Sequence, residues 1–116
     1  MADVLAQVPN GLPRDANATA IQGTYNNFAS GHSTVVTGGT AVALAASFTQ
    51  AKKLEILNPT SNADILVVGD SGVTVSPING IPIEPGFSYP LGVTDLSKVY
   101  VNSATNGATF TYNYFW

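Results

Sequence analysis

The sequence contains no cysteine, a single histidine and few charged residues, and each shortage excludes a class of structure or chemistry. Without cysteine, neither disulfide bonds nor thiolate metal ligands can hold the fold. Charged residues make up 9% of the chain, against roughly a quarter in typical soluble proteins. Four basic and seven acidic residues give a net charge of −3, which argues against nucleic acid or an anionic membrane as a partner.

Long apolar runs and targeting signals are also missing. The longest mostly apolar run, 41–48, has 8 residues, whereas a helix that crosses a bilayer needs about 20. The N-terminal segment 1–9 has no basic stretch followed by an apolar one, so it carries no signal for secretory export. We therefore expect a protein that is made in the cytoplasm and has no membrane partner.

Small polar residues take the place of the missing charges. The chain contains 12 Thr, 10 Asn, 9 Ser and 11 Gly, alongside 45% hydrophobic residues. Threonine favours strands, while glycine, asparagine and serine favour tight turns, and this composition is poor for helices. The 116 residues suffice for one domain with its own core but not for two.

The composition changes near residue 33, which divides the chain into an extended N-terminal arm, 1–32, and a β-sandwich domain, 33–116. Breaks at Pro9, Pro13, Gly23 and Gly31 exclude a long regular element in the arm. The arm nevertheless contains more apolar residues than a solvated linker needs, and these are its candidate partner-binding residues. They are Val4, Leu5, Val8, Leu12, Ile21, Tyr25 and Phe28. The arm either lies along its own domain or along a partner, and the sequence leaves both open.

Short strand patterns recur about every ten residues after the arm. The clearest is 51–58, where Leu54 and Ile56 alternate with Lys53 and Glu55. The other predicted strands are 33–37, 40–49, 64–68, 73–76, 98–102 and 108–116. The alanines of 41–46 also suit a helix, but the flanking threonines and phenylalanine favour a strand.

Turn residues complete the prediction of the fold class. Asn106-Gly107 is typical of a hairpin turn that leads into the last strand. Because Pro82 has no backbone donor, 81–83 is expected to be an edge strand or an extended loop. The expected fold class is all-β, a two-sheet β-sandwich of which the jelly roll is one form.

The inventory of reactive side chains is small. His32 is the one histidine that could act as a base, and its Ser-Gly surroundings indicate a solvated loop. The carboxylates at predicted strand ends, two of which could meet in space, are Asp64, Asp70, Glu84 and Asp95. Asp70 precedes Ser-Gly and is better explained as a β-turn cap than as part of a calcium loop, which needs further acids. We expect no catalytic set, no metal site and no cofactor.

The last predicted strand is unusually aromatic. It sets Phe110, Tyr112, Tyr114 and Trp116 on one face, and the chain ends in three consecutive aromatic residues. These side chains could fill the core, form an interface or provide a platform on which a sugar stacks. The interface candidates are Tyr112, Tyr114, Phe115 and Trp116.

The segment 53–116 also resembles a known class of proteins in its series of strands and turns. The series is the strand 54–58 before a polar turn, the strand 65–69, the proline-glycine segment 80–86, the strand 98–101 and a closing aromatic strand. It is similar to small β-sandwich structural proteins of tailed-bacteriophage virions, above all to head decoration (cement) proteins. That class has no active-site motif, so no residue role is carried over.

The resemblance implies a capsid decoration protein that binds the outside of the head and stabilises capsomer joints. Its partners would be the major capsid protein and further copies of itself, with a trimer favoured, and it would be synthesised in the host cytoplasm and located on the virion. It would have no small-molecule substrate and no enzymatic activity. The alternative is a tail or fibre accessory protein that contacts host-surface glycan through Tyr112, Tyr114 and Trp116. A small hydrolase with a carboxylate pair is the third and weakest reading.

Overall fold

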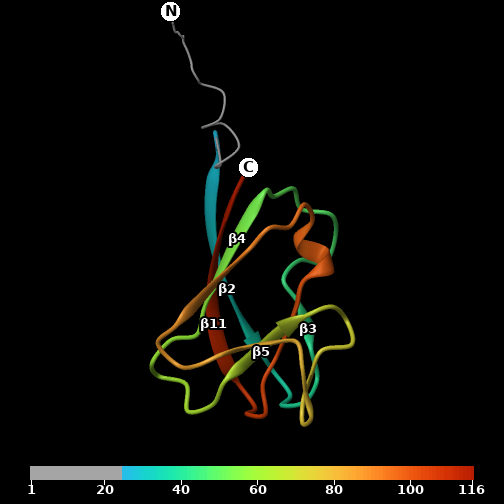
Figure 1. The fold of residues 1–116 in the computed structure, drawn as a ribbon, viewed down its shortest axis with the longest axis vertical. Helices are drawn as coiled ribbons and strands as arrows, with labels where there is room; N and C mark the ends of the chain where they lie inside the picture. Colours follow the sequence, from blue (N-terminus) through green and yellow to red (C-terminus); the bar gives the residue numbers. More distant parts are fainter. Residues whose placement is uncertain (1–24) are drawn as a thin grey trace, which may run out of the picture.

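A computed structural model describes residues 25–116 and shows an all-β fold (Figure 1), which confirms the predicted fold class. Among these residues the one helical element is the 3₁₀ turn η1, Leu96–Lys98. The strands of one large sheet are β2 (Phe28–Val35), β11 (Ala108–Phe115), β4 (Lys53–Leu57) and β9 (Ser88–Leu91), in that spatial order. Those of the other are β3 (Val42–Ala43), β10 (Tyr100–Asn102), β5 (Leu66–Gly69) and β8 (Ile81–Ile83). A small hairpin, β6 (Thr74–Val75) and β7 (Ile78–Asn79), separates β5 from β8.

The strand pairings of the two large sheets are nested. The first described strand pairs with the last, β2 with β11, and the next strand pairs with the second last, β3 with β10. The pairs β4–β9 and β5–β8 follow in the same way, and successive pairs alternate between the sheets. Residues 28–115 therefore form one long antiparallel hairpin that is rolled into two layers. Eight strands in this arrangement make a jelly roll.

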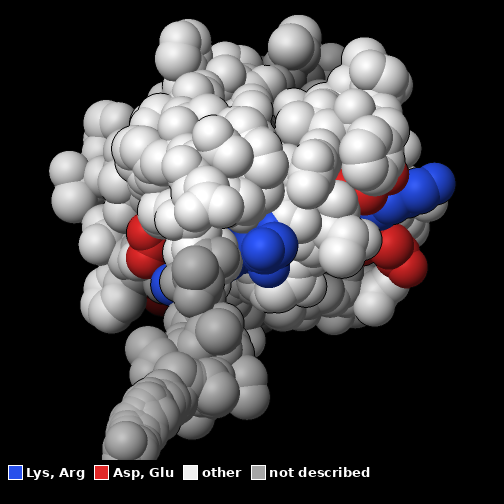
Figure 2. Space-filling model, turned by 90° about the horizontal axis from the view of Figure 1, so that it is seen from above, with Lys and Arg blue, Asp and Glu red and all other residues white. Residues whose placement is uncertain are grey.

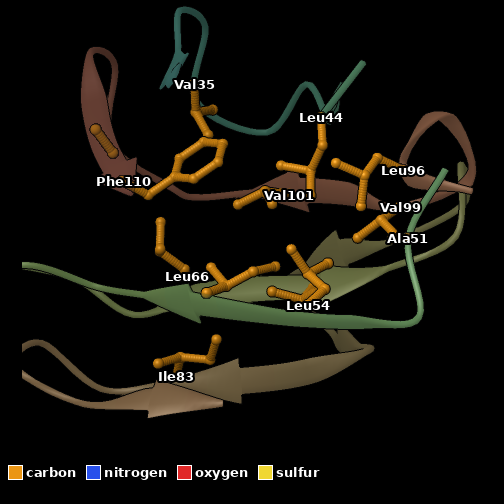
Figure 3. Packing of buried hydrophobic residues seen from close by; sticks show 13 residues of the cluster. Val35, Leu44, Ala51, Leu54, Leu66, Ile83, Leu96, Val99, Val101 and Phe110 are labelled. Carbon is orange, nitrogen blue, oxygen red and sulfur yellow. The ribbon is translucent and has the colours of Figure 1, made fainter. Parts of the chain in front are cut away.

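The core fills the space between the two layers (Figure 3). Each layer contributes residues from alternate positions of its strands, as the period of two requires. Leu54 and Ile56 point inward from β4, whereas Lys53 and Glu55 lie on the other face, as predicted. The fully buried apolar side chains include Val35, Leu54, Ile56, Leu66, Val101 and Phe110. Figure 3 shows Phe110 beside Val35, with Leu66 across the layer.

Two of the predicted strands differ from the structure. The predicted strand 33–37 starts earlier, at Phe28, so Ser30-Gly31 is not a break and His32 lies in a strand rather than a loop. In place of the predicted strand 40–49, the structure has the short strand Val42–Ala43, followed by bends and irregular backbone. Alanines explain the second difference, because they offer too little side chain to pack a long strand against a sheet. Residues 41–46 form no helix either.

The Asn106-Gly107 turn is also different from the prediction. The strands on either side, β10 and β11, belong to different sheets, so the turn crosses from one layer to the other and is not a hairpin. Gly107 has φ +77°, a conformation that favours glycine. Its N–H donates to the Val35 carbonyl at 2.8 Å, and the Asn106 side chain accepts from the Gly38 N–H at 2.7 Å. These two hydrogen bonds therefore hold the connection between the sheets against the end of β2 and the residues that follow it.

Two other predictions, one of a turn and one of an edge strand, are confirmed. Asp70 caps its β-turn: its Oδ1 accepts from the Gly72 N–H at 2.9 Å, and its carbonyl accepts from the Val73 N–H at 3.0 Å. Pro82 lies in β8, which is an edge strand of its sheet. A proline is tolerated there because an edge strand has a partner on one side only.

Candidate interaction surface

The structure brings two of the predicted arm residues onto the domain. Phe28 pairs with Phe115 in the β2–β11 register, and their ring centroids lie 5.0 Å apart. The Tyr25 ring lies 5.4 Å from that of Phe115. We call Tyr25, Phe28 and Phe115 the outer aromatic cluster, because Phe115 points to the face of the sheet opposite the core. The other predicted arm residues, Val4, Leu5, Val8, Leu12 and Ile21, lie outside the described residues.

The outer aromatic cluster is accessible and has a cation beside it. Phe28 is 61% exposed, while Tyr25 and Phe115 are half-buried against each other and their neighbours. The Lys53 ammonium lies 5.8 Å from the centroid of the Phe115 ring, within range of a cation–π interaction. The end of the molecule shown in Figure 2 is otherwise mostly uncharged, with blue and red atoms in a few separate places. An exposed apolar cluster on such a surface is a candidate for contact with another macromolecule.

The remaining interface candidates lie on the opposite, inner face of β11. Tyr112, Tyr114 and Trp116 continue the line of Phe110 toward the end of the strand, as the alternation predicted. Successive ring centroids are 6.4, 6.2 and 5.2 Å apart along this row. Phe110 is fully buried, Tyr112 and Tyr114 pack against the rim of the core, and Trp116 is partly exposed. We call these four residues the inner aromatic row.

Ring faces within the inner aromatic row are largely occupied by neighbouring rings. The planes of Tyr112 and Tyr114 are 26° apart, and those of Tyr114 and Trp116 are 18° apart. Tyr114 is therefore stacked on both sides. A sugar platform needs an open aromatic face, and this row offers its edges instead. The arrangement favours packing over glycan stacking.

Gly31 provides the space in which the Tyr112 ring lies. A Cβ atom at this position would come within 2.5 Å of Tyr112 Cζ and 2.6 Å of its hydroxyl oxygen. Burial raises the pKa of the Tyr112 hydroxyl above its ordinary value, and the neighbouring Tyr114 adds to the effect. Sequence reasoning missed this role of Gly31 because the dipeptide Ser30-Gly31 is more typical of a turn.

Backbone hydrogen bonds fix the end of β11 between its neighbours. The Trp116 carbonyl accepts from the N–H groups of Asn26 and Asn27 at 2.9 and 2.8 Å, and the Trp116 N–H donates to the Asn27 carbonyl at 3.1 Å. On the other side, the Lys52 N–H donates to the Phe115 carbonyl at 2.7 Å. The aromatic end of β11 is thus bonded on both sides, next to the point where the chain joins the domain.

The groups considered for catalysis lie apart from the aromatic end or serve the fold. His32 is exposed on the outer face of β2, opposite Thr111. Asp64 accepts a hydrogen bond from the Thr105 hydroxyl. Within residues 25–116, no group of three or more His, Cys, Asp and Glu side chains is placed to hold a metal ion. No helix in the same part of the chain is long and apolar enough to cross a membrane.

A cleft of about 520 Å³ opens between the ends of the two sheets and brings Asp70 and Asp95 to one place. Its walls are mostly apolar, and Lys52 and Lys98 line it together with the two aspartates. The other residues that line the cleft are Val68, Gly69, Ile81, Leu91, Gly92, Val93, Thr94 and Val99. Both aspartates use Oδ1 to hold turns, which supports a structural role for them.

Asp95 joins two segments at this cleft. Its Oδ1 accepts from the Ser97 hydroxyl at 2.8 Å, the Ser97 N–H at 3.0 Å and the Thr49 N–H at 3.2 Å. Partial desolvation raises the pKa of Asp95, but these hydrogen bonds and the nearby Lys98 ammonium outweigh it and hold the pKa below its ordinary value of 3.8. The charged form is therefore more stable in the folded chain than in the unfolded chain.

Replacing Asp95 with asparagine is expected to lower the Tm at neutral pH, because the charge-assisted hydrogen bonds are weakened. A lowered pKa stabilises the fold above the unfolded-state value of 3.8, and this stabilisation is lost as the pH falls through the folded-state value. The Tm difference between Asp95→Asn and the wild type should therefore shrink below pH 3.8. Thermal unfolding across this range checks it, with the exposed Glu84→Gln as the matched control. A difference independent of pH would contradict the assignment.

Neither the models of protein families nor the curated proteins give a match to the sequence. The class that the fold defines is an antiparallel jelly-roll β-sandwich.

Proposed function

We propose that this chain is a structural protein of a tailed-bacteriophage virion, a capsid decoration protein that binds the outside of the head. Its partners in this proposal are the major capsid protein and further copies of itself, and its role is mechanical rather than enzymatic. The observation that carries the proposal is the outer aromatic cluster, in which Tyr25 and Phe28 meet Phe115 at the end where residues 1–24 attach. Because residues 1–24 attach next to the outer aromatic cluster, that segment and the cluster can contact the same partner.

The outer aromatic cluster supplies the binding energy in this proposal. Phe28 is 61% exposed in the free chain, and its full burial against a partner is worth up to about 1.5–3 kcal/mol. The neighbouring Lys53 ammonium adds a polar group beside this apolar centre, and an apolar centre with a polar rim is the usual composition of an interface. A protein that binds only the assembled shell stabilises that shell by mass action.

The fold and the sequence resemblance support the same proposal. Jelly rolls with two four-stranded sheets occur in viral capsid proteins, and also in lectins and cupins. The fold therefore allows the structural function without specifying it. The resemblance of 53–116 to head decoration proteins favours the capsid class among them.

The alternative, a tail or fibre protein that stacks host glycan on the inner aromatic row, has weaker geometric support. The faces of Tyr114 are covered by Tyr112 and Trp116, so a sugar would meet ring edges along most of the row. Trp116, at the end of the row, is the position where a sugar could stack. The head proposal uses a more exposed aromatic residue, Phe28.

The number of copies per particle separates the two proposals. Quantitative mass spectrometry of purified virions of the encoding phage, with the major capsid protein as internal reference, gives this number directly. A decoration protein is present in hundreds of copies, whereas a tail or fibre protein is present in tens or fewer. Absence from the purified particle would overturn both.

A further inference from the structure

Strand β2 has a partner strand on only one side in the described part of the chain. It pairs with β11 alone within residues 25–116. At its start, Asn27 and Trp116 exchange both N–H···O bonds, at 2.8 and 3.1 Å. Bonded and non-bonded pairs alternate in an antiparallel ladder, so odd-numbered residues of β2 direct their backbone groups to β11. The N–H and C=O groups of the even-numbered residues point away from β11. These residues are Phe28, Ser30, His32 and Thr34.

The other three edges of the jelly roll are protected against a further strand. Edge strand β3 has only 2 residues, while β8 contains Pro82 and β9 contains Pro90. Short strands and prolines are the devices by which proteins block sheet edges. Strand β2 has 8 residues and contains no proline, lysine, arginine, aspartate or glutamate. It is therefore the one edge in the described part of the chain that is open to strand addition.

We propose that β2 pairs with β2 of a second copy, antiparallel and about a twofold axis, so that two four-stranded sheets become one continuous sheet. The protected edges argue for this occupant. Because β3, β8 and β9 are blocked, β2 is the one edge that residues 25–116 of another copy can offer. Such a contact uses the same surface on both copies and closes at two. It therefore differs from the trimer that the sequence resemblance implies, and it does not rest on the proposed function.

The register follows from the positions of the outward-facing groups. A twofold axis at Gly31 is the arrangement in which all four outward-facing residues meet a counterpart. Ser30 then faces His32 of the second copy, and Phe28 faces Thr34 of the second copy. No formally charged side chain faces another when histidine is neutral, so the edge is complementary to itself.

Sedimentation velocity of the full 116-residue chain over a range of concentrations tests the proposal. We expect a dimer, and we expect His32→Pro to weaken its dissociation constant at least about tenfold, because proline removes an outward-facing donor from each copy. The matched control is Ser71→Pro, which lies at the second position of the Asp70 turn, where proline is favoured. It should dimerise like the wild type.

Cysteine pairing tests the register without relying on a proline variant. The chain contains no cysteine, so Ser30→Cys and His32→Cys each carry a single thiol. Directly opposed residues have Cα atoms about 5.5 Å apart, which a disulfide can bridge. On oxidation, a mixture of the two variants should form predominantly the disulfide between residues 30 and 32.

Three outcomes would overturn the proposal. The first is a wild-type chain that stays monomeric at all concentrations, even if its edge amides are protected by another segment of the same chain. The second is an oligomer that His32→Pro leaves intact. The third is a mixture of Ser30→Cys and His32→Cys that forms no preferred mixed disulfide. None of these results would alter the copy number in virions, so the two proposals fail separately.

Discussion

Replacing Phe110 with alanine is expected to lower the free energy of unfolding by about 3–5 kcal/mol, the cost of emptying a buried aromatic site. Phe110 has 0% exposure and packs with Val35 and Tyr112 in the core between the sheets. Phe110 is also the buried first residue of the inner aromatic row. Its replacement therefore removes apolar contacts in the core and the ring against which Tyr112 packs. Chemical denaturation followed by circular dichroism measures the effect.

The matched control for this change is Phe87→Ala. Phe87 is 66% exposed, and surface substitutions usually change stability by less than about 0.5 kcal/mol. Equal effects of the two substitutions would show that Phe110 is not a core residue, and the assignment of β11 to the centre of its sheet would be wrong.

The parts of the fold that the sequence predicted are those whose pattern is local. In 51–58 and 108–116, apolar and polar residues alternate because one face of each strand is buried, and the structure has both strands. Pro82 marks an edge strand because its missing donor acts at that residue alone. The same local logic identified the Asp70 turn.

Pairings between distant segments could not be predicted in this way. The start of β2 could not be predicted, because Gly31 resembles a break in the sequence. Its role becomes clear only from the Tyr112 ring, which lies over it in the structure. The Asn106-Gly107 turn looks like a hairpin, and only the sheet order shows that it crosses between layers.

The candidate interaction surface likewise has one part that follows from a local pattern and one part that depends on strand pairing. The inner aromatic row follows from alternation within one strand, so the sequence identified Tyr112, Tyr114 and Trp116 together. The outer aromatic cluster requires the β2–β11 register, which places Phe28 opposite Phe115. Sequence reasoning assigned these two residues to separate surfaces, the arm and the end of the chain, and their contact is a result of the fold.

Replacing Phe28 with serine is expected to lower the affinity of the protein for phage heads by roughly tenfold to a hundredfold while leaving its stability nearly unchanged. The ring is 61% exposed in the free chain, so little folding energy depends on it. Burial in an interface is worth up to about 1.5–3 kcal/mol for such a side chain, and each 1.4 kcal/mol or so corresponds to a factor of ten. Thermal unfolding of the variant checks that the fold is retained.

The most direct test of the proposed function is a binding curve on heads purified from a phage that lacks the protein. Protein that sediments with the heads is measured against free protein for the wild type, Phe28→Ser and the matched control Phe87→Ser, whose ring is similarly exposed at 66%. The proposed function predicts that the wild type and Phe87→Ser saturate the heads at hundreds of copies with the same midpoint, and that Phe28→Ser needs a higher concentration. A wild-type chain that does not bind heads, or a Phe28→Ser curve that coincides with the wild type, would contradict the account.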